Sequence, residues 1–251
     1  IGAGLASALD PDIRIESDRW NLDVGYYTAP IATDWELTTN LSYLSTTHEN
    51  KNNLTLYPPG SNLGFGVLPQ GLIGNPAMSE KHYRFNASVF YHGLARHQFR
   101  LGTGYHQGDL YKVEETKNFG IDPATGLPLP AGAGLVEVTD TPYAFLPEKK
   151  RENRFLFAQD IWSMARNWEL TAGLRYDHYS DFGETTNPRF ALVWHSTPKL
   201  TSKLLYGEAF RAPAFNESYI MNTPVLLGNP DLKAETISSL ELAFNYLATK
   251  D

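Results

Sequence analysis

Apolar and polar residues alternate along much of this chain, and the alternation is regular enough to predict strands. In the stretch that begins at Trp168, one face carries Trp168, Leu170, Ala172, Leu174 and Tyr176. The residues between them are polar, charged or glycine. A repeat of two residues is the period of a β-strand, whose successive side chains point to opposite faces. One face of this strand therefore requires an apolar surrounding, and the other requires water or polar partners.

The same period predicts about nine strands in all. They are Trp20–Tyr26, Trp35–Tyr43, Tyr83–Tyr91, Phe99–Tyr105, Phe155–Met164, Trp168–Tyr179, Pro188–His195, Leu200–Phe210 and Leu240–Tyr246. Residues 1–18 precede the first strand and are interpreted as a loop. The segment Phe155–Met164 is apolar on both faces, so the pattern does not assign its inside and its outside.

The connections between the predicted strands alternate in length. Short turns are expected at Pro30–Asp34, Leu94–His97, Ala165–Asn167 and Thr197–Lys199. Long loops without either period are expected at Thr46–Glu80, Glu114–Lys150 and Arg211–Glu235, with a short exception at Asp181–Thr186. Short turns at one end and long loops at the other are typical of a barrel that spans the bacterial outer membrane.

The spacing of aromatic residues supports this interpretation. Trp35 and Tyr43, like Tyr83 and Tyr91, lie eight positions apart on an apolar face. At ~3.3 Å per residue and a tilt of ~40°, this separation spans roughly 20 Å of height, close to the ~25 Å apolar band of such barrels. We therefore predict an all-β fold: an antiparallel up-and-down transmembrane β-barrel with long extracellular loops. On this prediction, outward residues such as Leu174 and Leu242 face lipid.

Composition narrows the alternatives. The 251 residues are 42% hydrophobic, yet no run approaches the ~18 consecutive apolar residues of a membrane-spanning helix. The net charge of -7 disfavours a nucleic-acid partner, and the absence of cysteine excludes disulfides and cysteine-ligated zinc. A soluble carbohydrate-binding β-sandwich is an alternative, as is a passive porin-like or structural barrel. Long strands, and long loops on one side only, argue against the sandwich.

Ordered motifs in the second half of the chain carry a resemblance to a known family. They read LTAGLRYDHYSDFG at 170–183, TNPRFALVW at 186–194, YGEAFRAPAFNE at 206–217 and GNPDLKAET at 228–236. Weaker similarity runs through RLGTGYHQGDLY at 100–111 and FAQDIW at 157–162. In these motifs the chain resembles the barrel of TonB-dependent outer-membrane receptors.

The resemblance implies a 22-stranded barrel in the bacterial outer membrane, plugged by an N-terminal domain. Such a receptor takes up a metal chelate, such as a ferric siderophore, and obtains energy from TonB through the plug. This chain departs from that pattern, because it has about nine strands and no plug, and because Thr249–Asp251 replaces the usual terminal aromatic strand. Residues 1–9 also lack the basic leader of a signal peptide, so we expect a mature or internal start. We therefore interpret residues 1–251 as a partial barrel, with outer-membrane lipid as a partner and with the TonB-contacting plug absent.

No catalytic constellation stands out, and we predict no enzymatic activity, no metal site and no cofactor. The histidines fall singly along the sequence, without metal-ligand spacing. Haem receptors of the family carry boxes similar to two found here, formed by Phe210, Arg211, Ala212 and Pro213 and by Asn229, Pro230, Asp231 and Leu232. In that family a haem-ligating histidine lies between the boxes, but this chain has none there, so haem is disfavoured and Tyr219 is the only conceivable axial ligand.

For both boxes, a role in shaping the loop is favoured over a ligand role. The prolines restrict the backbone, Asn229 and Asp231 can bond their own backbone, and Arg211 can pair with Glu235. Ligand contact is expected instead from aromatic residues of the long loops, which could stack on an aromatic chelate. The candidates are Tyr57, Phe65, Tyr143, Phe145 and Tyr219.

Overall fold

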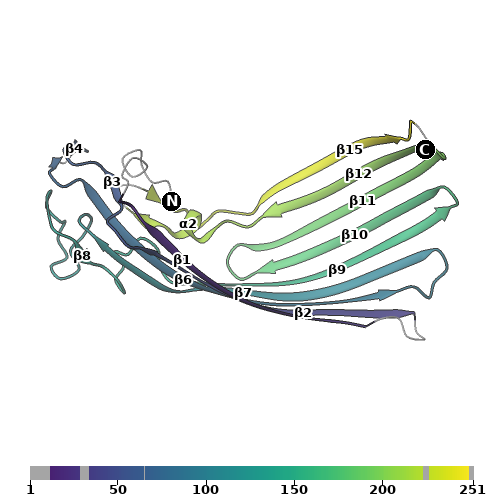
Figure 1. Cartoon of the computed structure of the whole chain (residues 1–251), viewed down its shortest axis with the longest axis horizontal. Coiled ribbons are helices and arrows are strands. Elements are labelled where there is room, and N and C mark those ends of the chain that lie inside the picture. Colours follow the sequence, from purple (N-terminus) through teal and green to yellow (C-terminus); the bar gives the residue numbers. More distant parts are fainter. Residues whose placement is uncertain (1–11, 29–33, 65, 223–225, 249–251) are drawn as a thin grey trace.

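The computed structural model describes residues 12–28, 34–64, 66–222 and 226–248. Nine long strands in these residues form one antiparallel sheet, in the order β1-β2-β6-β7-β9-β10-β11-β12-β15 (Figure 1). They are β1 (Ile15–Tyr27), β2 (Trp35–Asn50), β6 (Leu72–Tyr91), β7 (His97–Lys117), β9 (Lys149–Ala165), β10 (Trp168–Tyr179), β11 (Gly183–Thr197), β12 (Leu200–Arg211) and β15 (Glu235–Tyr246). The predicted all-β, up-and-down antiparallel fold is confirmed.

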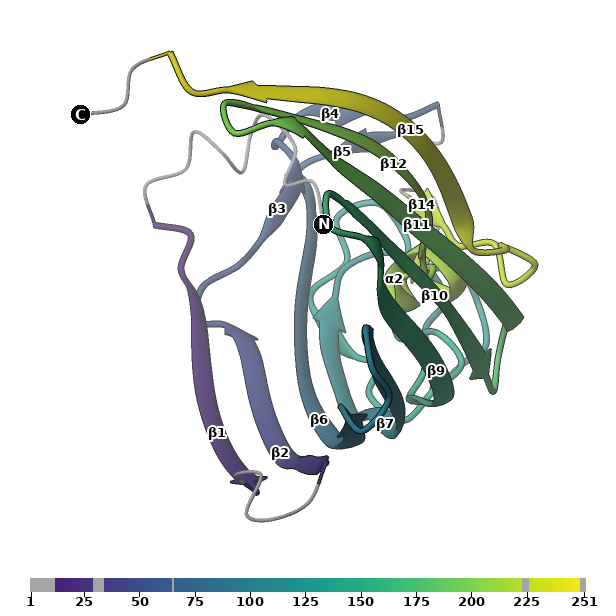
Figure 2. The same cartoon turned by 90° about the vertical axis from the view of Figure 1, so that its right-hand side faces the viewer.

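The sheet curls into an open trough. Figure 2 shows β1 and β15 at its two edges, with the remaining long strands curving between them. Among the described residues, β1 pairs only with β2, and β15 pairs only with β12. An unpaired strand edge is costly in lipid, because nothing there replaces the missing hydrogen bonds. The trough therefore has the geometry of part of a larger barrel.

The convex face of the trough is apolar and exposed. Leu174 is 51% exposed and Leu242 is 65% exposed, and both lie on the outward side of their strands, as predicted; their contact with lipid stays a prediction. Aromatic rings form rows on this face. One row runs from Trp20 through Tyr43 to Tyr83, with ring centroids 5.3 and 5.0 Å apart. Towards the other end of the strands, the rings of Trp35 and Tyr91 lie 4.5 Å apart, and those of Trp168 and Trp194 lie 5.1 Å apart.

The concave face combines charged side chains with aromatic rings that lie over glycines. On β7, a Cβ at Gly104 would collide with the Phe155 ring, and one at Gly102 would collide with the Phe157 ring. Leu156, between these two phenylalanines, is exposed on the outside. The structure therefore settles the orientation of β9, whose two apolar faces made it ambiguous in the sequence. Phe155 and Phe157 face the concave side because the glycines leave room for them.

Several strands extend further than the sequence pattern predicted. β2 continues to Asn50 and β6 begins at Leu72, so the predicted loop Thr46–Glu80 is too long at both ends. The predicted loop 1–18 is also wrong at its end, because β1 begins at Ile15. These extensions lie beyond the apolar band. In them, both faces of a strand meet polar surroundings or folded loops. The period of two is lost there although the backbone pairing continues.

Folded loops cover the long-loop end of the trough. They contain β3 (Thr55–Tyr57), β4 (Ser61–Asn62), β5 (Val67–Leu68), β8 (Val136–Glu137), α2 (Phe215–Tyr219), β13 (Met221–Asn222) and β14 (Leu226–Leu227). Two clusters of buried side chains lie at this end, one around Leu110 and Phe145 and the other around Leu72 and Phe119. No helix in the described part of the chain is long and apolar enough to cross a membrane.

Candidate functional site

A pocket of about 360 Å³ lies at the long-loop end of the concave face. Strands β6, β7 and β9 provide one wall, and the loop before β9 together with the segment around α2 provides the other. The pocket is lined by Met78, Glu80, His82, His106, Gly108, Phe145, Leu146, Arg151, Ala214, Phe215 and Asn216. Its size and its mixture of apolar and polar residues are typical of a small-molecule site.

Phe145 joins the two loops that cover this pocket. Its side chain is only 2% exposed and packs with Leu110 and Ile220 in one buried cluster. Its backbone N–H donates to Glu115 Oε2 at 2.7 Å, and its carbonyl accepts from the N–H of Met221 at 2.7 Å. The β7–β9 loop is thereby fastened to β7 on one side and to the β12–β15 loop on the other.

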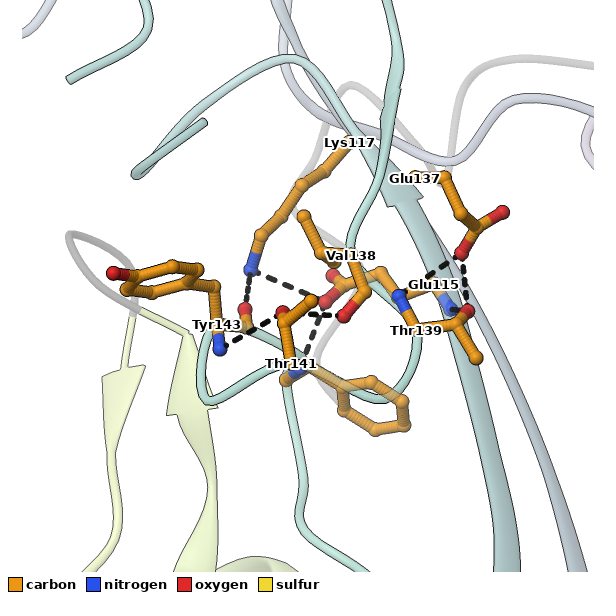
Figure 3. Close-up of polar contacts among 8 residues, drawn as sticks. Glu115, Lys117, Glu137, Val138, Thr139, Thr141 and Tyr143 are labelled. Atoms are coloured by element: carbon orange, nitrogen blue, oxygen red, sulfur yellow. Dashed lines mark hydrogen bonds and ion pairs between the residues drawn. The ribbon is translucent and has the colours of Figure 1, made fainter. Parts of the chain in front are cut away.

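A buried ion pair on β7 holds the same loop (Figure 3). Glu115 Oε2 and Lys117 Nζ lie 3.1 Å apart, and their side chains are 1% and 3% exposed. Lys117 also donates to the carbonyl of Tyr143, and the N–H of Val138 donates to the carbonyl of Glu115 at 2.9 Å. Burial raises the pKa of the Glu115 carboxyl, while Lys117 and the N–H of Phe145 oppose that shift. Loop carbonyls and amides thus satisfy two charges that would be costly to bury alone.

Arg151 anchors the segment around α2 to β9. Its Nε donates to Asp181 Oδ2 at 2.7 Å, and its Nη1 donates to the carbonyl of Pro213 at 2.7 Å. The guanidinium also lies against the rings of Phe182 and Phe215, 5.3 and 4.8 Å from their centroids. Its charge is already paired, so Arg151 positions the pocket wall more than it offers a free cation to a ligand.

Two histidines meet in the pocket. His82 Nδ1 and His106 Nε2 lie 3.2 Å apart, and His82 Nε2 lies 3.2 Å from Glu80 Oε2. The short turn before β7 sets the register, which places His82 opposite Gly108 and His106 opposite Arg84. Because Gly108 has no side chain, the His82 ring can lie within 3.2 Å of where a Cβ would stand. The two histidines fall singly in the sequence, but counting outward from the short turn between β6 and β7 brings them together.

A second hollow, of about 450 Å³, lies further down the concave face, towards the short turns. Arg100 lies there between the rings of Phe90 and Phe157, 4.8 and 5.2 Å from their centroids. Arg175 pairs with Asp177 at 2.7 Å, with its guanidinium 3.7 Å from the Phe155 centroid. This charged and aromatic wall is the expected lining of a wet barrel interior.

The aromatic residues predicted to contact a ligand do not gather in one place. Tyr219 packs against the cluster around Phe145, with Lys149 Nζ 4.7 Å above its ring, whereas Tyr57 packs against the separate cluster around Leu72. Tyr143 contributes its carbonyl to Lys117. Phe65 lies outside the described residues. Of the candidates that the structure describes, only Phe145 lines the pocket, and a ligand role stays a prediction for all of them.

The two boxes make the contacts expected of loop-shaping residues. Arg211 pairs with Glu235 through two hydrogen bonds of 2.9 and 2.8 Å, as predicted, and also with Glu217 at 2.9 Å. Asn229 Oδ1 accepts from the N–H of Asp231 at 3.0 Å, which is the predicted bond to its own backbone segment. Pro213 is buried and receives the bond from Arg151.

In the described part of the chain, no group of three or more histidine or acidic side chains could hold a metal ion. The prediction of no resident metal site therefore stays a prediction. A metal that enters this pocket would need some of its ligands from elsewhere.

Comparison with known proteins gives the family. The family model for TonB dependent receptor-like β-barrels matches residues 3–250. The iron-regulated outer membrane virulence protein of Vibrio cholerae is 36% identical over 95 residues, which are 36% of this chain and 15% of that protein. A vitamin B12 transporter of V. cholerae is 34% identical over 115 residues, which are 45% of this chain and 18% of that protein.

A solved structure shows the same fold. The outer membrane transporter YddB from Escherichia coli superposes with a TM-score of 0.65 at 15% identity, over 95% of this chain and 33% of that one. The chain therefore spans about a third of that transporter's length and less of the two relatives. With the family model matching nearly its whole length, the chain belongs to the TonB-dependent receptor β-barrels of the outer membrane.

Proposed function

We propose that this chain is part of a receptor that takes up a metal chelate, such as a ferric siderophore, across the outer membrane with energy from TonB. The observation that carries the proposal is the pocket at the long-loop end, because short periplasmic turns place that end at the cell surface. Interlocked loops hold its walls, so the pocket is formed before a ligand arrives. The relative named as iron-regulated supports iron as the cargo metal.

The proposal is tested with the full-length receptor that contains this chain, produced in cells that lack their own chelate receptors. Uptake of a panel of radiolabelled ferric siderophores and vitamin B12 is measured with and without TonB. We expect at least one chelate to accumulate only when both the receptor and TonB are present.

A passive porin-like barrel is the competing function. It predicts accumulation that does not depend on TonB and that rises in proportion to external concentration, with no saturation. Uptake of that kind would overturn the proposed receptor function. A variant with Phe145→Ala, which opens the contact between the two loops, should weaken saturable uptake, whereas Leu127→Ala in the exposed part of the same loop serves as the matched control.

A further inference from the structure

The hydrogen bonds around His82 fix where its protons lie. Glu80 is an ordinary carboxylate at neutral pH and only accepts hydrogen bonds, so the His82 nitrogen facing it, Nε2, carries the proton. A neutral His82 then has an unprotonated Nδ1, which accepts a hydrogen bond from His106 Nε2–H at 3.2 Å. The three residues form a directed relay from His106 to Glu80.

The relay leaves one nitrogen available. With its proton on Nε2, His106 keeps an unprotonated Nδ1, and no hydrogen bond of this atom occurs among the described residues. His106 lines the pocket and is partly exposed, so this nitrogen is not sealed inside the protein. A histidine whose far N–H is hydrogen-bonded, with a carboxylate behind, is the arrangement that supports metal-bound imidazoles, because it fixes the tautomer and the orientation of the ring.

The structure assigns His106 Nδ1 as a ligand for the metal of an incoming chelate that leaves at least one coordination position open. No three histidine or acidic side chains in the described residues are arranged to hold a metal ion alone, so the chelator must supply the remaining ligands. His82 and Glu80 act as positioning residues through His106. This inference rests on the proposed uptake function and narrows its substrate class, because a chelator that fills all coordination positions gains nothing from the imidazole.

Two copper chelates provide a matched pair of probes. Nitrilotriacetate leaves coordination positions of Cu²⁺ open, whereas ethylenediaminetetraacetate occupies nearly all of them, and both complexes are anionic. Binding of each to the purified full-length receptor in detergent is measured by calorimetry, and electron paramagnetic resonance reports nitrogen coordination to the copper. We expect the nitrilotriacetate complex to bind at least tenfold more tightly and to show a nitrogen signal.

Variants separate the ligand from its positioning residues. His106→Gln should abolish the nitrogen signal, while His82→Gln and Glu80→Gln should each weaken affinity about 10- to 100-fold, the usual effect of removing a partner behind a metal ligand. His195→Ala is the matched control, because His195 bonds Thr201 near the short-turn end, away from the pocket. It should leave both readouts unchanged.

Two results would overturn the inference. One is equal affinity of the receptor for the two copper complexes, which needs no variant and so does not depend on the folding of any substitution. The other is a nitrogen signal that persists in His106→Gln. Either result leaves TonB-dependent uptake untouched, whereas TonB-independent uptake with an intact nitrogen signal would remove the proposed function and keep the metal contact.

Discussion

The apolar band of the trough and its long-loop end are stabilised in different ways. In the band, the outward leucines and aromatic residues are exposed, with Leu240 reaching 72% exposure, and the inward side chains face a polar interior. At the long-loop end, Leu72 is fully buried and Leu110 is 1% exposed, within clusters that resemble the core of a soluble protein.

The difference indicates which surroundings each region requires. The band has no core of its own, and its strands are held together by their ladders of backbone hydrogen bonds, an arrangement suited to an apolar surrounding such as lipid. The long-loop end lies beyond the aromatic row of Trp20, Tyr43 and Tyr83 and must exclude water by itself. The cost of a substitution in the band should therefore depend on how well the new side chain suits an apolar surrounding. At the long-loop end, it should depend on how well the new side chain fits a packed core.

The largest effect is expected at the buried ion pair. Lys117→Met leaves the Glu115 carboxylate buried without its partner, and we expect a loss of about 3–5 kcal/mol in the free energy of unfolding. The double variant Glu115→Gln/Lys117→Met removes both charges, keeps an acceptor for the N–H of Phe145 and should recover most of that loss. Urea unfolding of the full receptor in lipid bilayers measures both. A double variant as unstable as the single one would contradict the idea that the unpaired charge causes the loss.

In the band, the strongest effect is expected from a charge placed towards lipid. Leu174→Arg, like Leu242→Arg, should cost roughly 2–4 kcal/mol if these residues face the middle of the bilayer. Asn187→Arg, on the inward face of β11, is the control and should cost much less because it meets water. Equal costs at Leu174 and Asn187 in the same bilayer unfolding assay would show that the outward face does not meet lipid.

A smaller effect is expected where the concave face is tightly packed. In Gly104→Ala, the new methyl group would meet the Phe155 ring and lie 2.7 Å from the carbonyl oxygen of Phe85. Such overpacking typically costs about 1–3 kcal/mol. Gly207→Ala, where nothing lies within 4 Å of the new atom, serves as the control. Thermal unfolding of the two variants should differ, and equal midpoints would contradict tight packing at Gly104.

The smallest effect is expected at the exposed end of the β12–β15 loop. Two hydrogen bonds lower the pKa of the Glu217 carboxyl below its usual 4.5. The bond from Arg211 has the larger effect, and the bond from the N–H of Ala214 has the smaller one. Because the pKa of Glu217 is lower in the folded protein than in the unfolded one, its ionised carboxylate stabilises the fold at pH values above the unfolded-state pKa. This stabilisation is lost as the pH falls through the folded-state pKa. Amide exchange at Ala214, corrected for the intrinsic rate, should therefore be protected at pH 6 and less protected below pH 4. In Glu217→Gln this pH dependence should disappear, and its persistence would assign the effect to another group.

Periodicity predicted the nine strands, their antiparallel order and the outward face, because each strand of the band has an apolar outer face and a polar inner face. It placed Leu174 and Leu242 correctly, and it anticipated the Arg211 to Glu235 pair. It failed at the strand ends, where Ile15–Asp18 and Thr46–Asn50 proved to be strand, since both faces there have similar surroundings. The turn predicted at Pro30–Asp34 lies largely outside the described residues.

The candidate site was much less accessible to prediction. The loop aromatics were chosen by composition, but burial of Phe145 and the separation of Tyr57 from Tyr219 follow from how the loops fold over β6 and β7. No local pattern in the sequence encodes that folding. The register of β6 and β7, by contrast, could have been counted from their short turn.

By itself, the sequence determined the class of fold and the family, because alternation and ordered motifs are local properties of the chain. Only the tertiary structure brought Glu80, His82 and His106 into one hydrogen-bonded row and buried Glu115 with Lys117 under a loop. The physical reason is that hydrogen bonds and burial depend on distances between residues far apart in the chain. Those distances are set by strand register and by loop packing, which residue types alone do not fix.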